Sequence, residues 1–211
     1  EEGSLISLAV AVGEGAEDGL EGDTTGEDGD SDSGGDTAGG TDDEHGGGTE
    51  TREAENLYGI ATINATSILA PDAPGVSYST SNLVDENPET CWAEGVPGYG
   101  IGEMIVYTFP HEIEVTKIYC IPGLLKVGDR GQDRWLQNGR LKTVKISFDD
   151  GTQTTFTFTD EKKWQEITLD RPHKTLNVTF TIVDVYPGRS GPNWTAAEDT
   201  SVSELHVWGY Y

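Results

Sequence analysis

The position of the aromatic residues constrains the fold of this chain more than any other feature. All 18 Phe, Trp and Tyr side chains lie after Leu57, whereas residues 1–55 carry 18 of the 38 acidic residues, 14 of the 28 glycines and one base, Arg52. A segment of that composition cannot bury enough apolar surface to offset the entropy lost on ordering. The sequence therefore predicts a disordered acidic linker over residues 1–55 and one folded domain over residues 56–211.

The charge balance restricts the partners of the chain. With 38 acidic and 13 basic side chains, the formal net charge is -25 at pH 7. Such a field repels the phosphates of nucleic acids and anionic lipids, so we expect no nucleic-acid partner.

The chain shows neither a membrane anchor nor a signal peptide. The apolar run Leu5–Val12 is eight residues long, far below the ~20 that span a bilayer, and Glu1 and Glu2 stand where a signal peptide carries positive charge. The only methionine is Met104. We therefore expect a piece of a longer protein, with any export signal or anchor in the missing part.

From Leu57 onward, apolar residues alternate with polar ones, a period typical of strands with one buried face. The alternation is clearest over 176–182 and 144–148, and Asp149-Asp150-Gly151 predicts a hairpin turn into a strand over 154–159. Further extended runs cover 103–109, 112–121, 164–169 and 201–208. One helical turn is expected near Ser81–Val84, with Ser79 or Ser81 as its cap.

These elements predict an all-β fold, a two-layer jelly-roll sandwich of about eight antiparallel strands. Three segments without regular alternation, 70–102, 122–139 and 186–200, are long and rich in aromatic or charged residues. Segments of that length are usually functional or disordered, so we expect the functional residues in these loops.

Several short motifs in the folded part resemble those of one family. Leu83–Trp92 (LVDENPETCW) and Ser203–Gly209 (SELHVWG) are similar to the entry loop and closing strand of discoidin-like (coagulation-factor type C) galactose-binding modules. Further matches to one branch, the NADase-type glycan-binding domain, occur at 94–103, 138–142, 184–188 and 199–204. The resemblance covers about residues 60–209 and implies a jelly-roll binding module, often tethered outside a bacterial cell.

The loop Asp85–Thr90 is a candidate calcium site. Asp85, Asn87 and Thr90 offer hard oxygen ligands of the kind that calcium prefers. In similar modules a glutamate of the last strand reaches across to a structural calcium, a role that the resemblance gives to Glu204. The alternative is that Asp85 and Thr90 bond the loop's own backbone. Glu86 replaces the usual glycine and restricts a backbone angle that such a loop needs.

The two cysteines, Cys91 and Cys120, both lie in the folded part. In an exported domain they form either one disulfide or two buried free thiols, and the sequence leaves both open.

A sugar site needs an aromatic ring against the apolar face of a pyranose and polar groups for its hydroxyls. Trp135 beside Arg134 is the leading pair, because both lie in a segment between strands. Asn138 and Arg140 belong either to the site or to the attachment of the loop. Trp92 and Trp208 are expected in the core, and Trp164 fits either place. The full candidate set is Trp135, Arg134, Asn138, Arg140, Tyr99, Tyr186, Arg189 and Trp194, with Arg130, Glu94 and Asp133 as further polar groups.

Catalytic motifs are missing from the sequence. The four histidines are scattered, and no nucleophile, zinc or phosphate-binding motif occurs. We therefore expect a non-enzymatic glycan-binding module, displayed outside the cell on the flexible linker and holding at most a structural calcium. A protein-binding adhesion or assembly domain is the alternative, and a two-carboxylate glycoside hydrolase is the third interpretation. The sequence does not indicate an oligomeric state or the identity of the glycan.

Overall fold

The computed structural model describes residues 52–211. The run Leu5–Val12 and nearly all of the linker expected at residues 1–55 lie outside the described residues, so both stay predictions. Within the described part, none of the helices is long or apolar enough to cross a bilayer.

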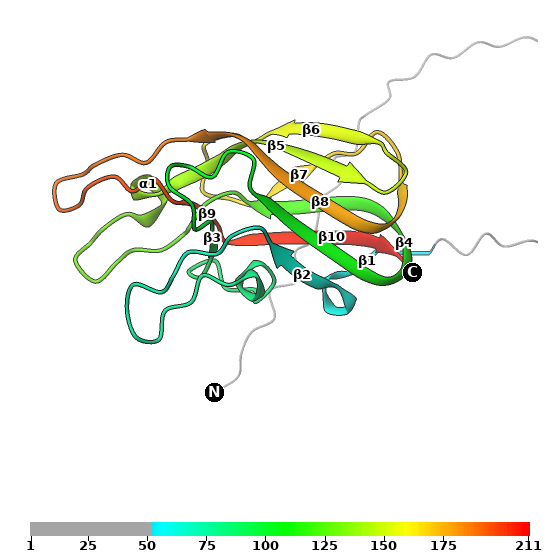
Figure 1. Cartoon of the computed structure of the whole chain (residues 1–211), viewed down its shortest axis with the longest axis horizontal. Coiled ribbons are helices and arrows are strands. Elements are labelled where there is room, and N and C mark those ends of the chain that lie inside the picture. Colours follow the sequence, from blue (N-terminus) through cyan, green and yellow to red (C-terminus); the bar gives the residue numbers. More distant parts are fainter. Residues whose placement is uncertain (1–51) are drawn as a thin grey trace, which may run out of the picture. The chain divides into compact units, whose positions relative to one another are not determined.

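The strands form one curled sheet whose two halves pack as layers, which confirms the predicted β-sandwich (Figure 1). The first layer runs through β2 (Thr62–Ala65), the first half of β4 (Met104–Ile121), β8 (His173–Tyr186), β5 (Gly139–Phe148) and β6 (Gln153–Thr157). It continues beyond β5 into β9 (Thr200–Val202) and β3 (Trp92–Ala93). The second layer consists of β1 (Glu55–Asn56), β10 (Glu204–Tyr210), the second half of β4, and β7 (Gln165–Ile167).

Strand β4 joins the two layers. The sequence predicts two strands at 103–109 and 112–121, but the structure has one long strand whose register shifts between Thr108 and Ile113. Its first half pairs with β2 and β8, the pairing with β8 continues past the register shift to Val115, and the rest of the second half pairs with β10 and β7. A second departure from the prediction is the parallel pairing of β5 with β9, since all other strand pairs in the described residues are antiparallel.

The core lies between the layers. The first layer contributes Tyr107, Ile146 and Phe180, and the second contributes Ile118 and Val207, all of them buried. The Tyr107 hydroxyl donates a hydrogen bond to the Leu205 carbonyl oxygen and so links the layers directly. Burial raises the pKa of this phenol, so it stays a neutral donor.

The helical segments are short. They are the 3-10 turns η1 (Tyr58–Ile60) and η2 (Thr80–Leu83) and the helix α1 (Arg134–Gln137). The turn η2 confirms the helical turn expected near Ser81, although the side chain of its N-cap, Ser79, makes no capping bond. Helix α1 was not predicted, and it is capped by the Asp133 carboxylate, which accepts a hydrogen bond from the Leu136 N–H.

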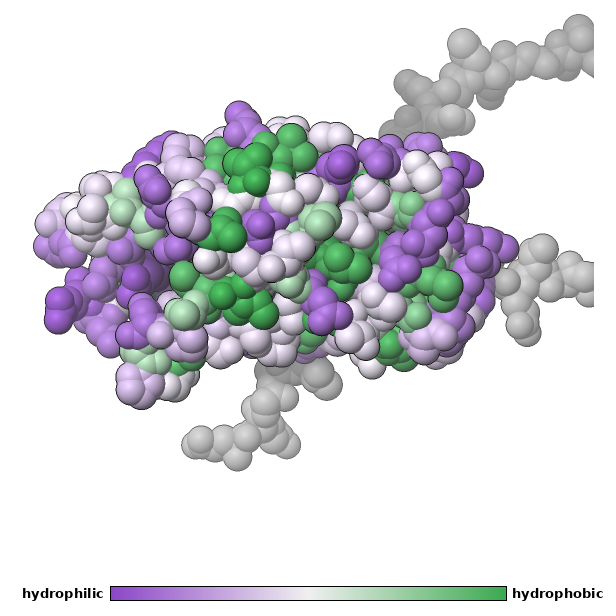
Figure 2. Space-filling view, viewed as in Figure 1, coloured by the Kyte–Doolittle hydropathy of each residue, from purple (hydrophilic) through white to green (hydrophobic). Residues whose placement is uncertain are grey.

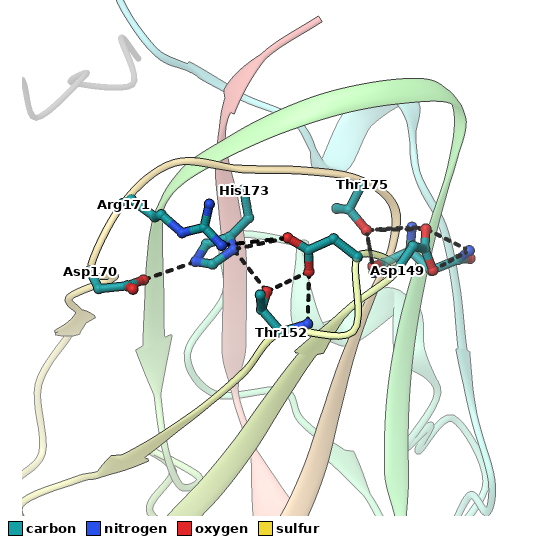
Figure 3. Close-up of polar contacts among 8 residues, drawn as sticks. Asp149, Thr152, Asp170, Arg171, His173 and Thr175 are labelled. Atoms are coloured by element: carbon teal, nitrogen blue, oxygen red, sulfur yellow. Dashed lines mark hydrogen bonds and ion pairs between the residues drawn. The ribbon is translucent and has the colours of Figure 1, made fainter.

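The hairpin between β5 and β6 confirms the turn predicted at Asp149–Gly151 and closes one end of the sandwich (Figures 1 and 3). The Asp149 carboxylate accepts hydrogen bonds from the backbone N–H groups of Leu176 and Asn177, at 2.8 Å each. Burial acts to raise the pKa of Asp149, but these bonds outweigh it and lower the pKa. The turn is therefore held to β8 by an ionised carboxylate.

This contact also breaks the alternation of β8. Val178, Phe180 and Ile182 face the core as predicted, but Leu176 is 45% exposed, and Thr175 is buried in its place. The register of β8 against β4 shifts at this point. Between the pairs Thr108–Asn177 and Ile113–Thr175, β4 has four residues and β8 has only Leu176. The prediction that Leu176 faces the core is wrong because the alternation of β8 changes face at this irregularity.

Candidate functional site

The long loops gather at the end of the sandwich opposite the β5–β6 hairpin, where α1, β3 and β9 also lie (Figure 1). Helix α1 holds two of the loops together. The Leu136 carbonyl oxygen accepts a hydrogen bond from the Arg189 N–H at 2.7 Å, and the Gln137 carbonyl oxygen accepts one from the Ala197 N–H at 2.9 Å. Figure 2 shows a hollow lined by hydrophilic residues at this end. We call it the loop-end site.

Tyr78 is an aromatic residue of the first long loop with a polar partner. Its hydroxyl donates to the Asp72 carboxylate at 3.1 Å, and its ring packs on a small apolar cluster beneath the loops. Burial and the negative charge of Asp72 raise the pKa of Tyr78 to about 12, while the nearby Arg134 guanidinium opposes the shift. A ring and a carboxylate of one loop are therefore bonded to each other here, and the Arg134 guanidinium is close enough to act on the phenol electrostatically.

A third loop adds carboxylates. Burial, with repulsion from Asp72 and Glu198, raises the pKa of Asp199. The sequence analysis missed Asp72, Tyr78 and Asp199, because no local pattern distinguishes a loop residue that meets another loop from one that does not. Their only signal is their position in two of the three long loops.

Trp135 is not an exposed platform. It is 2% exposed, and its Nε1 donates to the Asp160 carboxylate at 3.1 Å. A Cβ placed on Gly123 would lie 2.8 Å from the Trp135 ring, so the ring is packed closely against that backbone. The expectation that Trp135 projects into solvent is wrong, because α1 turns the side chain inward.

Arg140 is likewise enclosed. Its guanidinium is paired with both oxygens of Asp160, at 2.9 Å each, and also donates to the carbonyl oxygens of Asn138 and Pro187. The interpretation of Arg140 as a loop anchor fits these contacts, and its interpretation as a sugar donor does not. The bonds from Arg140 keep the pKa of Asp160 low despite partial burial.

The other predicted sugar-binding residues are divided between anchoring and exposed positions. Tyr186 donates to the Phe158 carbonyl oxygen, Trp194 to the Arg189 carbonyl oxygen, and Arg134 to the Gln137 side chain. Tyr99 lies beside Gly139 and accepts a bond from Thr200 at its carbonyl oxygen. Arg189 keeps 66% of its side chain exposed. Of the remaining predicted groups near the loops, Asn138 and Asp133 are half-buried and Arg130 is exposed.

Glu94 is fully buried and holds two segments together. Its two oxygens accept hydrogen bonds from the N–H groups of Val96 and Thr200, at 2.9 and 3.1 Å. Burial nevertheless raises the pKa of Glu94. Gly100, at φ 63°, leaves space for this side chain, since a Cβ there would lie 2.5 Å from Glu94 Cγ. Glu94 therefore shapes the loop-end site without facing it.

The Asp85–Thr90 loop bonds largely to itself. The Asp85 carboxylate accepts from the Asn87 N–H at 3.0 Å and from the Thr90 hydroxyl at 2.7 Å, as the alternative to a calcium site anticipated. Glu86 adopts φ 60°, a left-handed angle that favours glycine, and its carboxylate accepts a bond from the Tyr58 hydroxyl at 2.7 Å.

Glu204 is compatible with a cation next to this loop. The Ser203 hydroxyl donates to the Pro88 carbonyl oxygen at 2.8 Å and so ties the loop to the start of β10. Glu204 is fully buried; one oxygen bonds His206, and the other has no partner among the described residues. An orphaned buried carboxylate oxygen costs free energy, and a calcium ion would satisfy it. No group of three or more His, Cys, Asp or Glu side chains placed for a metal occurs within residues 52–211.

Cys91 and Cys120 are both buried and unbonded, which agrees with free thiols rather than a disulfide. Burial raises the pKa of Cys91 to about 12 and that of Cys120 as well, so neither is a reactive thiolate.

An acid, a histidine and a hydroxyl do align at the hairpin end, remote from the loops (Figure 3). His173 Nε2 lies 3.1 Å from Asp170, and Nδ1 lies 3.1 Å from the Thr152 hydroxyl. However, Thr152 also bonds the Asp150 carboxylate, which can only accept its proton. His173 Nδ1 and the Asp150 carboxylate therefore compete for the one proton of the Thr152 hydroxyl. The group is therefore built to hold the turn, not to activate a nucleophile.

Comparison with known proteins identifies the family. A sequence model described as "NAD glycohydrolase translocation F5/8 type C domain" matches residues 55–208. The chain belongs to this family. No curated protein matches the chain. The translocation-domain family thus accounts for nearly all of the described residues.

Solved structures show the same fold. A family 32 carbohydrate-binding module of Clostridium perfringens NanJ, solved with galactose, is 18% identical with a TM-score of 0.50; the match covers 74% of this chain and 99% of that one. A second C. perfringens module, solved with GalNAc-β-1,3-galactose, is 16% identical with a TM-score of 0.50, covering 72% and 99%. The mycobacterial arabinofuranosyltransferase AftD is 20% identical with a TM-score of 0.52, covering 75% and 11%. The chain therefore has the fold of a carbohydrate-binding module.

Proposed function

We propose that this domain is a non-catalytic glycan-binding module whose ligand lies in the loop-end site. The observation that carries the proposal is the hydrogen bond between Tyr78 and Asp72 at the loop end, with the charge of Arg134 acting on Tyr78 and that of Asp72 acting on Asp199. An aromatic ring offers an apolar face to a pyranose, and the guanidinium and carboxylates match its hydroxyls as donor and acceptors. The fold, shared with modules solved with galactose-containing sugars, supports the same conclusion.

The sequence-based candidates complete this proposed site in part. Arg134 belongs to it, and Tyr99, Asn138, Arg189 and Trp194 lie on segments at the same end of the sandwich, whereas Tyr186 ends strand β8. Trp135 and Arg140 support the site without contacting the ligand. Asp160 bonds both of them, so it fixes Trp135 of α1 and also Arg140, which holds the loop after β8 at the Pro187 carbonyl oxygen.

A glycan array on the whole chain is the first experiment, followed by isothermal titration with the best ligand. Arg134→Ala should weaken binding by roughly 10- to 150-fold, the range for losing a hydrogen bond from a charged group. Arg171→Ala is the matched control, since Arg171 is an exposed arginine at the opposite end of the sandwich. Unchanged affinity in a normally melting Arg134→Ala variant would place the ligand elsewhere. Release of reducing sugar from polysaccharides would show catalysis instead.

We also propose a structural calcium held by Asp85, Asn87, Thr90 and Glu204. The support is the unpartnered oxygen of Glu204 beside a loop of oxygen donors. Calcium added after chelator treatment should raise the melting temperature, and Glu204→Gln should abolish the rise. An unchanged melting temperature on addition of calcium would contradict the proposed calcium site.

Display outside the cell on the acidic linker is part of the same proposal. The name of the family, a translocation domain, and the acidic composition of residues 1–55 support it. Labelling of intact cells with an antibody against the domain tests it, and a signal seen only after lysis would contradict it.

A further inference from the structure

The second layer has an outer face that the loop-end site does not use. It is formed by β1, β10, the second half of β4, and β7. Residues paired across antiparallel strands share one face, so the pairs His206–Tyr119, Trp208–Lys117, Tyr210–Glu114 and Tyr119–Glu166 lie on it together. Tyr58 and Trp164, from the segments next to β1 and β7, complete this surface, which we call the outer face.

The outer face is rich in aromatic rings that touch one another. His206 lies between two of them, with ring centroids 4.9 Å from Tyr58 and 4.8 Å from Trp164. Tyr119 and Trp208 meet edge to face at 6.2 Å. Trp164 is 44% exposed, a large value for a tryptophan outside the core. The Trp208 Nε1 donor is buried and has no partner among the described residues.

Carboxylates surround these rings. Glu86 accepts the Tyr58 hydroxyl at 2.7 Å, and that bond, with burial, raises the pKa of Tyr58 to about 12. Burial and the adjoining Glu166 raise the pKa of Tyr119. Glu114 lies opposite Tyr210 on one side and opposite Lys174 of β8 on the other, so strand pairing places two bases, Lys117 and Lys174, beside the carboxylates Glu86, Glu114 and Glu166. Rings flanked by an excess of carboxylates present negative potential, the complement of a cation.

Arg52, a cation of the chain itself, packs against aromatic rings at one end of the outer face. The Arg52 guanidinium lies over the Tyr210 ring at 5.1 Å and near the Tyr211 ring at 6.0 Å, and it donates a hydrogen bond to the Tyr211 carbonyl oxygen. Tyr210 follows Trp208 and His206 at alternate positions of β10, so all three side chains point the same way. The chain itself thus shows which chemical group these rings accept.

We propose that the outer face binds an arginine-bearing peptide segment of a partner protein, with one guanidinium seated on Trp164 and others paired with Glu166 and Glu86. This interaction is independent of the glycan site, because the outer face lies on the strands of the second layer and not on the loops. The module would then hold a glycan at its end and a basic protein segment on its side.

The test uses the whole chain and a fluorescent octapeptide of alternating arginine and serine, with a glutamine-serine peptide as the neutral control. Anisotropy is measured at ~10 mM salt, where charge interactions reach about 30 Å. The arginine peptide should bind and the glutamine peptide should not. Trp164→Ala keeps every charge of the protein and should weaken binding roughly 2- to 30-fold, the range of a cation–π contact. Leu176→Ala is the matched control, equally exposed at the hairpin end.

Three results would overturn the proposal. If Trp164→Ala binds the arginine peptide as tightly as the wild type, the peptide is attracted by the overall negative charge of the chain and not by a site at Trp164. Equal binding of the glutamine peptide would exclude a cation site, and equal loss in Leu176→Ala would exclude the outer face. If Trp164→Ala melts abnormally, the peptide affinity of Glu166→Gln becomes the deciding measurement. Glu166 is exposed on the same face, so its replacement should weaken arginine-peptide binding without removing a ring, and unchanged affinity would overturn the proposal. Glycan affinity measured on the same variants should stay at the wild-type value, which separates this proposal from the loop-end site.

Discussion

Asp160→Ala tests the idea that one carboxylate holds the loop-end site together. Asp160 accepts hydrogen bonds from Nε and Nη2 of the Arg140 guanidinium and from Nε1 of Trp135. Without it, a guanidinium whose side chain is 1% exposed keeps only the carbonyl oxygens of Asn138 and Pro187. A buried charge that loses its counter-ion destabilises a protein far more than a surface pair does.

The magnitude follows from burial. Breaking a fully buried pair costs about 3–5 kcal/mol, and because the Asp160 side chain is 25% exposed we reduce this cost to about 2–4 kcal/mol. For a folded unit of this size that corresponds to a fall in melting temperature of roughly 5–15 °C. Glycan affinity should fall as well, because α1 and the loop after β8 lose their common anchor.

Thermal melting followed by circular dichroism measures the effect. Asp184→Ala is the control, since Asp184 also pairs with a base, Lys142, but with 49% of its side chain exposed. We expect that variant to melt like the wild type. If Asp160→Ala and Asp184→Ala melt alike, the buried pair does not stabilise the loops and the reasoning fails.

Three further predictions concern thiols, pH and the linker. Thiol titration should detect Cys91 and Cys120 only after denaturation, whereas a disulfide would give no thiols at all. Because Arg140 lowers the pKa of Asp160, stability from that carboxylate is present above about pH 4 and lost as the pH falls further; a melting temperature that stays level down to about pH 2 would contradict this. Deleting residues 1–50 should leave the melting temperature unchanged, and a shift of several degrees would show that the segment docks on the domain.

Strands with strict alternation could be predicted well from the sequence. Val144, Ile146 and Phe148 face the core as their spacing indicates, because period two is a local property of an extended chain. Leu176 shows the limit of that logic. The register of β8 shifts against β4 at this residue, and its N–H donates to the Asp149 carboxylate of the β5–β6 turn, so both of its partners lie far from Leu176 in the sequence.

The candidate site was harder to predict for the same reason. Trp135 and Arg140 have the composition of a sugar site, but both are satisfied by Asp160, a residue 20 or more positions away. Tyr78 and Arg134 come from different loops and were not linked by any motif. A sequence pattern reports what one segment does, whereas a binding site depends on which segments meet.

The pairing of β1 with β10 has a consequence for engineering. Glu55 stands opposite Gly209, and Arg52 touches the Tyr211 carbonyl oxygen, so the first and last described residues are neighbours. They lie at the end away from α1, β3 and β9 (Figure 1). A few glycines would bridge residues 211 and 52, and the chain could be reopened at the β5–β6 turn to give a circular permutant with the same layers. Fusion partners attached at residue 52 or at residue 211 would likewise leave the loops unobstructed.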